Sequence, residues 1–175
     1  MIKDSKSAES LAKILSEALP YIQKFSGKIV VIKYGGSAMK ENKLRQNFAR
    51  DIALMRQIGI FPVLVHGGGP QIERNLKKNN IKSVFIDGLR KTDENSIKTI
   101  VKTLRAVNGD IAELIKTWGA RTKTFNDVRE SILICKKIKT KIDLGFVGDI
   151  TKVDASLIKK NIFSGKIPVI APIGR

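Results

Sequence analysis

Residues 61–72 read FPVLVHGGGPQI, and this stretch decides the fold, because it joins a strand-like run to a glycine turn and a proline. Short apolar runs rich in valine and isoleucine are typical of strands buried on both faces of a parallel sheet. Pro70 suits the first position of a helix. Residues 28–37 read KIVVIKYGGS and repeat the pattern. Two successive strand–turn–helix units predict a parallel sheet with right-handed crossovers.

Periodicity and turn residues assign the rest of the chain. An apolar stripe over residues 7–24 predicts a helix, which we expect Pro20 to kink or end. Residues 120–150 indicate short strands, including a hairpin across 143–150. The other expected elements are strands over 28–33, 61–65, 84–87 and 167–172, and helices over 41–58, 70–79, 93–106, 108–118 (broken near Asn108-Gly109) and 154–163. The predicted class is α/β, with a mostly parallel open sheet, helices on both faces and an N-terminal helical extension over residues 1–26.

The chain is strongly basic, with 33 lysines and arginines against 16 acidic residues and a net charge of +17. This balance attracts anions such as nucleotides and phosphates. The lysines are dispersed and aromatic residues make up only 6%, which argues against nucleic-acid binding. We expect no membrane span and no signal peptide. The single cysteine, Cys135, is interpreted as a buried apolar side chain in a reduced, cytoplasmic setting.

The two glycine turns form the candidate site. Ligands of parallel sheets bind at the carboxyl ends of the strands, so both turns should lie at the same edge. Glycine lets backbone N–H groups approach an anion closely, and a following helix adds a positive partial charge. Neither turn matches a P-loop or a dinucleotide fingerprint. We expect the turns to hold an anionic substrate and a phosphoryl group.

Three side chains near strand ends add to this site. Lys33 adjoins the first turn and is suited to stabilise charge on a migrating phosphoryl group. His66 is the only histidine and is expected to orient the second turn by hydrogen bonds rather than act as a general base. Arg90 has a fork suited to grip a carboxylate, with its neighbour Asp87 as the alternative partner. No metal-ligand spacing is present, so no protein-bound metal is expected.

Five segments in order resemble the N-acetylglutamate kinases of the amino-acid kinase superfamily. They carry the likeness from about residue 7 to residue 175, and the combination of HGGGP, GLRxTD and DLGFVG is specific to that kinase among its relatives. The segments are IKYGG (32–36), VLVHGGGPQI (63–72), DGLRKTD (87–93), DLGFVGDI (143–150) and IPVIAPIG (167–174).

The resemblance implies roles for the site residues. Lys33 would stabilise the transition state, and Arg90 would hold the α-carboxylate of N-acetyl-L-glutamate. The resemblance implies ATP as co-substrate, with Mg²⁺ carried on ATP, and N-acetylglutamyl 5-phosphate as the product, in the second step of arginine biosynthesis. It gives the glycines two roles: the phosphoryl path for Gly35, Gly36 and Gly67, and substrate-binding backbone N–H groups for Gly68 and Gly69.

The resemblance also implies an assembly and a division of the chain. Residues 7–24 look like the N-terminal helix that interlaces dimers into a hexamer in arginine-sensitive members, so a homo-oligomer is expected. Residues 27–175 correspond to the acetylglutamate-binding lobe. The family's ATP-binding lobe has no counterpart here, so the chain alone is expected to be inactive. The segment 119–131 departs from the family's glycine-rich turn.

Two other functions remain open at this point. The first is a non-catalytic acetylglutamate-binding or regulatory half-protein. The second is another amino-acid kinase, such as glutamate 5-kinase.

Overall fold

The computed structural model describes residues 5–39 and 41–175, and its centre is a four-stranded parallel sheet. The strands are β1 (Ile29–Tyr34), β2 (Phe61–His66), β8 (Lys166–Ile170) and β5 (Arg121–Phe125), in the spatial order β1-β2-β8-β5. All three neighbouring pairs are parallel. The predicted sheet is thereby confirmed.

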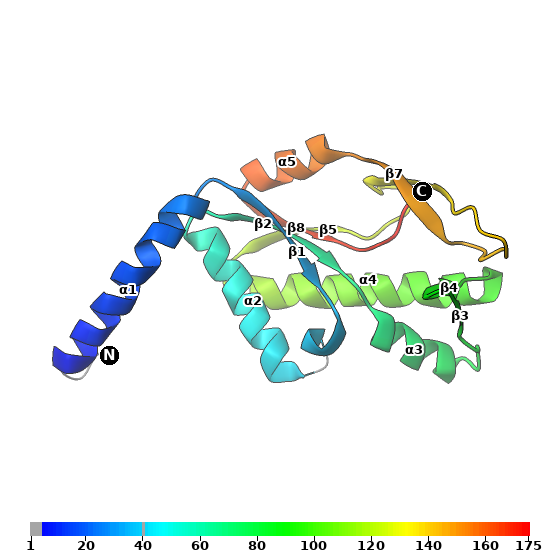
Figure 1. Cartoon of the computed structure of the whole chain (residues 1–175), viewed down its shortest axis with the longest axis horizontal. Helices are drawn as coiled ribbons and strands as arrows, with labels where there is room; N and C mark the ends of the chain where they lie inside the picture. Colours follow the sequence, from blue (N-terminus) through cyan, green and yellow to red (C-terminus); the bar gives the residue numbers. More distant parts are fainter. Residues whose placement is uncertain (1–4, 40) are drawn as a thin grey trace.

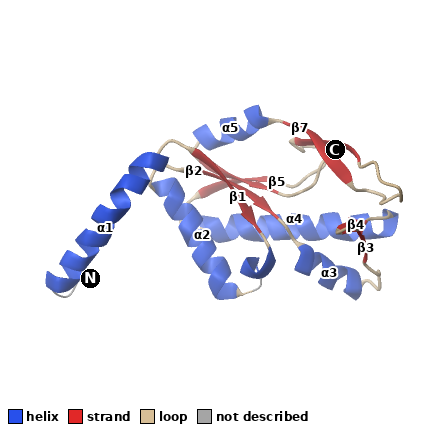
Figure 2. Ribbon diagram, in the orientation of Figure 1, coloured by secondary structure: helices blue, strands red, loops and turns tan. Residues whose placement is uncertain are grey.

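Helices cover both faces of this sheet, as expected (Figures 1 and 2). One face carries α2 (Asn42–Gln57) and α4 (Glu94–Lys116), and the other carries α5 (Ala155–Phe163). The helix α3 (Gly69–Lys78) lies beside α4, and α1 (Ser5–Phe25) projects from the body of the molecule (Figure 1).

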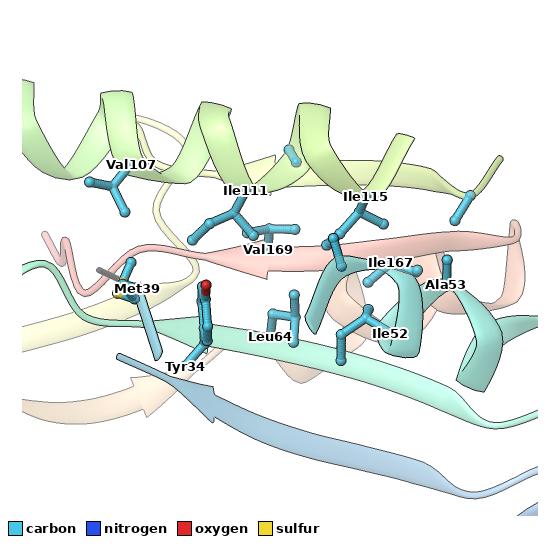
Figure 3. Close-up of a cluster of buried hydrophobic side chains, with 13 residues drawn as sticks. Tyr34, Met39, Ile52, Ala53, Leu64, Val107, Ile111, Ile115, Ile167 and Val169 are labelled. Atoms are coloured by element: carbon cyan, nitrogen blue, oxygen red, sulfur yellow. The ribbon is translucent and has the colours of Figure 1, made fainter. Parts of the chain in front are cut away.

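The larger core lies between the sheet and the helices α2 and α4. Figure 3 shows Ile52 from α2 and Ile111 and Ile115 from α4 pointing at the side chains of Leu64 and Val169 in the central strands. A second cluster fills the opposite face, where Ile162 of α5 packs against sheet residues. Burial of large apolar side chains on both faces of β2 and β8 explains why these strands read as continuous apolar runs.

Two antiparallel hairpins complete the fold. The first pairs β3 (Val84–Ile86) with β4 (Leu89–Lys91) across Asp87 and Gly88. Both turn residues have positive φ, 48° and 79°, as a type I′ hairpin turn requires. The second pairs β6 (Leu133–Lys137) with β7 (Gly148–Val153).

The structure corrects the predicted helix break at Asn108-Gly109. A single helix, α4, runs through both residues. Asn108 is fully buried, and its side chain hydrogen-bonds to groups outside the helix. These tertiary contacts outweigh the low helix propensity of the Asn-Gly pair.

Helix α1 covers the predicted segment 7–24 and continues through Pro20 to Phe25. One other expectation is wrong. The segment 143–147 forms no hairpin of its own, because its backbone pairs with Thr92 at the end of β4. The N–H of Thr92 donates to Leu144 O, and the N–H of Phe146 donates to Thr92 O. The segment therefore connects β6 to β7 and ties that hairpin to the start of α4.

Candidate active site

The two glycine turns lie next to each other at one edge of the sheet. Their strands β1 and β2 are neighbours, with Tyr34 paired to His66 as the last residues of each. The N–H of Gly67 donates to Tyr34 O at 2.8 Å. A Cβ on Gly35 would lie 3.8 Å from the nitrogen of Gly67. The expectation that both turns share one edge is confirmed.

The first turn leads into a short 3-10 helix, η1 (Gly36–Met39), rather than directly into an α-helix. Gly36 has φ of 66°, a conformation that favours glycine. The hydroxyl of Tyr34 donates to Ala38 O at 3.1 Å and its ring stacks on Phe48, which anchors the turn. The helix α2 begins at Asn42, one residue after the predicted start.

Lys33 extends from β1 on the face opposite the main core. Tyr34, the next residue, points into that core, and side chains alternate along a strand. The side chain of Lys33 is exposed. Within residues 5–39 and 41–175 it forms no salt bridge, so its ammonium group is free to meet an anion.

The second turn ends at the first residue of α3. Gly69 begins this helix and Pro70 lies in its first turn, as predicted. A Cβ on Gly68 would lie 3.0 Å from Cδ2 of Leu104, so the turn is packed closely on α4. A Cβ on Gly69 would meet nothing within 4 Å, which leaves open space above the helix N-terminus. The unpaired N–H groups of a first helical turn suit an anion at this place.

His66 is buried in a hydrogen-bond network. Its Nδ1 lies 2.7 Å from Gly67 O and its Nε2 lies 3.0 Å from Nδ2 of Asn108. An amide nitrogen can only donate, so Nε2 accepts and Nδ1–H donates to the carbonyl. Burial lowers the pKa of His66, and the hydrogen bond to Gly67 opposes this in part. The imidazole is neutral and orients the glycine turn, as the sequence indicated.

Arg90 is tied to α3 and not to its neighbour Asp87. Its Nη1 donates to Oε2 of Glu73 at 3.0 Å and also to Oγ of Ser83. The guanidinium lies over the ring of Phe85, 4.4 Å from the centroid. The alternative pairing with Asp87 is wrong, because within the described residues the ion pair of Arg90 is with Glu73.

The structure thus brings the predicted residues together in two groups. Lys33, Gly35, Gly36 and Gly67 gather where β1 and β2 end. Gly68, Gly69 and Arg90 are linked through α3, which begins at Gly69 and carries Glu73 one turn later. Both groups meet at the second glycine turn.

Four polar residues of this region had no predicted role in the site: Gln71, Glu73, Ser83 and Asn108. Glu73 and Ser83 lie outside the quoted motifs, and the partners of Asn108 are distant in the sequence. Oε1 of Gln71, in the first turn of α3, is buried and has no hydrogen-bond donor within the described part of the chain. An acceptor of this kind at the second glycine turn is available to a ligand N–H group.

A cavity of about 750 Å³ lies beside these groups, between α4, the β6–β7 hairpin and residues 172–174. None of the predicted site residues lines it. Leu104 lines the cavity and contacts the second turn, whereas Thr92 lines it and donates to Arg90 O at 3.0 Å. Half-buried Cys135 is also part of the wall.

Within residues 5–39 and 41–175, no group of three or more His, Cys, Asp or Glu side chains is arranged to hold a metal ion. No helix in that part of the chain is long and apolar enough to cross a bilayer.

Comparison with known proteins assigns a family to this arrangement. The model of the amino acid kinase family matches residues 28–175. Curated relatives include the acetylglutamate kinases of Clostridium beijerinckii, 45% identical over 93% of this chain, and of Stutzerimonas stutzeri, 45% identical over 99%. The chain spans 57% and 62% of the lengths of these two relatives.

A solved structure has the same fold. The N-acetylglutamate synthase of Neisseria gonorrhoeae, complexed with coenzyme A and N-acetyl-glutamate, superimposes with a TM-score of 0.78 at 24% identity. The likeness covers 92% of this chain and 37% of that one.

Proposed function

Since the chain belongs to the amino acid kinase family, we propose that it is the acetylglutamate-binding part of an acetylglutamate kinase. In this proposal residues 27–175 form the substrate lobe and residues 1–26 an N-terminal extension. The observation that carries the proposal is the juxtaposition of the two glycine turns, in a chain 45% identical to named acetylglutamate kinases.

The proposed reaction transfers the γ-phosphoryl group of ATP to the side-chain carboxylate of N-acetyl-L-glutamate. A carboxylate oxygen attacks the γ-phosphorus, the bond to the bridging oxygen breaks, and ADP and N-acetylglutamyl 5-phosphate leave. The substrate supplies the nucleophile, so the protein needs to contribute only positioning and charge stabilisation. Mg²⁺ in this proposal arrives on the ATP phosphates, and the setting is cytoplasmic.

The first glycine turn is assigned to the phosphoryl group. The ammonium of Lys33 would stabilise the charge that spreads over the transferring oxygens, and its exposure without an ion pair in the described chain supports this role. Gly35, Gly36 and Gly67 would line the path, and the backbones of Gly35 and Gly67 approach each other without intervening side chains.

The second glycine turn is assigned to the substrate. Backbone N–H groups at Gly68 and Gly69 would bind N-acetyl-L-glutamate at the start of α3, where open space remains above Gly69. The fork of Arg90 would hold the α-carboxylate. The link from Arg90 to α3 through Glu73 supports placing both contacts on one ligand.

The proposal also includes assembly of several copies of the chain into a homo-oligomer. Leu11, Ile14, Leu15 and Leu19 form an exposed apolar stripe along α1, which projects from the body of the molecule (Figure 1). A stripe of this kind is stabilised by packing against another apolar surface. We assign it to contact with α1 of a second copy, in a homo-oligomer of dimers.

One experiment tests the function through a chimera. The chain is joined to the region of the Clostridium beijerinckii relative that lies beyond the matched segment, and ADP release is followed with N-acetyl-L-glutamate or L-glutamate as acceptor. We expect turnover with N-acetyl-L-glutamate only. Turnover with L-glutamate alone would favour the glutamate 5-kinase alternative.

Calorimetry of the unmodified chain addresses the remaining alternative. We expect binding of N-acetyl-L-glutamate, as both a kinase and a non-catalytic binding module require. A chimera that binds substrate but releases no ADP would support that module and contradict the kinase.

A further inference from the structure

We propose that Glu73 is a positioning residue, which together with Ser83 holds the guanidinium of Arg90 in the orientation that receives the substrate's α-carboxylate. This inference rests on the proposed function and extends it to residues that no motif marks.

The guanidinium of Arg90 is restrained by three different groups. Oε2 of Glu73 accepts from Nη1 at 3.0 Å, Oγ of Ser83 accepts from the same nitrogen, and Phe85 supports the guanidinium from one side. Ser83 in turn donates to Oε2 of Glu73 at 2.8 Å. The three polar groups close a ring of hydrogen bonds around one end of the arginine.

These contacts leave one edge of the fork available. Within the described residues, neither Nε nor Nη2 of Arg90 donates a hydrogen bond. An arginine binds a carboxylate best through two parallel N–H bonds, and Nε with Nη2 is such a pair. The side chain of Arg90 is only 14% exposed, so a carboxylate bound there would be shielded from solvent.

The position of Glu73 connects the free edge of the guanidinium to the N-terminus of α3, where the substrate is proposed to bind. Glu73 lies four residues after Gly69, about one helical turn along α3. The hairpin that carries Arg90 is a two-stranded sheet separate from the central one. Through Glu73, the guanidinium is held against the same helix whose N-terminus is assigned to the substrate.

The carboxylate of Glu73 has an opposing effect, because it competes with the substrate's α-carboxylate for the guanidinium of Arg90. The side chain of Glu73 is 54% exposed, so solvent screens its charge. Hydrogen bonds from Ser83 and Arg90 lower the pKa of Glu73 and keep it ionised at neutral pH. We expect the ordering effect of the hydrogen bonds to outweigh the screened repulsion between Glu73 and the substrate.

The test compares two ligands that differ only in the group Arg90 would hold. N-acetyl-L-glutamate carries the α-carboxylate and 4-acetamidobutanoate lacks it. Calorimetry measures both dissociation constants on the full chain, unmodified and with Glu73→Ala, Glu73→Gln or, as a control, Glu113→Ala. Glu113 forms an exposed ion pair with Lys116 near the far end of α4.

We expect Glu73→Ala to weaken N-acetyl-L-glutamate binding about three- to tenfold, the cost of ordering one long side chain on binding. Binding of 4-acetamidobutanoate should not change. Glu73→Gln should restore most of the affinity, because the amide oxygen still accepts the hydrogen bonds. The control variant should match the unmodified chain.

Three outcomes would overturn the positioning role alone: equal weakening for both ligands, unchanged affinity in Glu73→Ala, or tighter binding of N-acetyl-L-glutamate. Failure of the unmodified chain to bind N-acetyl-L-glutamate would instead overturn the proposed function, and this inference with it.

Discussion

Asn108 in the middle of α4 donates from Nδ2 to Nε2 of His66 at the end of β2, over 3.0 Å. The same nitrogen donates to Val169 O of β8, and Oδ1 of Asn108 accepts from Asn126. One buried amide therefore joins three strand ends to the helix behind them. It also fixes the tautomer of His66 and, through that ring, the carbonyl of Gly67.

Replacing Asn108 should be costly. Asn108→Ala leaves the buried Nε2 of His66 without its donor and removes one donor from Val169 O, so we expect a loss of about 2–4 kcal/mol in the free energy of unfolding. Urea unfolding measures this loss. Asn79→Ala removes an exposed amide bonded to Thr99 and should cost less than about 1 kcal/mol. Similar losses of unfolding free energy in the two variants would show that the hydrogen bonds of Asn108 do not contribute more than an exposed one.

The lowered pKa of His66 predicts how stability depends on pH. The unfolded chain takes up a proton near pH 6.5, whereas folded His66 does so only at lower pH, because it is buried. The stabilisation is complete above about pH 6.5 and is lost as the pH falls below it. Urea midpoints at pH 7.5 and 5.5 should show the decrease.

His66→Gln is the control for this pH dependence. His66 is the only histidine. The carboxylates with shifted pKa values, such as Glu73 and Asp93, have usual pKa values of 4.5 and 3.8, and the fold lowers them further, so they do not titrate between pH 5.5 and 7.5. The variant should therefore have nearly equal midpoints at the two pH values. An undiminished decrease would assign the effect to other groups.

Lys33 should matter for turnover and not for folding. In the chimera, Lys33→Met is expected to lower kcat about 10²–10³-fold, as loss of a charge-stabilising group does. Its side chain is exposed, so the unfolding midpoint should hardly move. Lys28→Met, an exposed lysine just before β1, is the matched control for the ADP-release assay. A kcat equal to that of the control would rule out the catalytic role.

Replacing glycine by alanine should have opposite effects on stability at Gly145 and at Gly109. Gly145 has φ of 74°, and a Cβ there would collide with Thr92 O, so Gly145→Ala should destabilise the chain by about 1–3 kcal/mol. Gly109 lies inside α4 with nothing within 4 Å of an added Cβ. Gly109→Ala should stabilise the chain by about 0.5–1 kcal/mol. Thermal unfolding measures the midpoints of both variants. Midpoint shifts of the same sign would contradict the contacts described for the two glycines.

The α1 stripe predicts how assembly responds to charge. Leu15→Glu introduces a carboxylate into the exposed apolar stripe and should reduce the oligomer measured by sedimentation. Removing residues 1–24 should have the same effect. Glu17→Gln, outside the stripe, should leave the sedimentation coefficient unchanged. An oligomer that survives the deletion would exclude α1 as the contact.

The sequence by itself determined the parallel sheet and the location of its glycine turns. Valine- and isoleucine-rich runs, glycines and Pro70 act through local backbone preferences, which can be read without knowing the fold. The adjacency of the turns followed, because successive parallel strands end at the same edge. Lys33 and the glycines could therefore be placed in advance.

Tertiary structure alone decided the remaining contacts. Helix α4 continues through Asn108 because His66 and Val169, both distant in the sequence, satisfy its amide. Arg90 pairs with Glu73, 17 positions away, and not with Asp87, three positions away in the hairpin turn. These choices depend on which polar groups meet after packing, and neither periodicity nor local propensity carries that information.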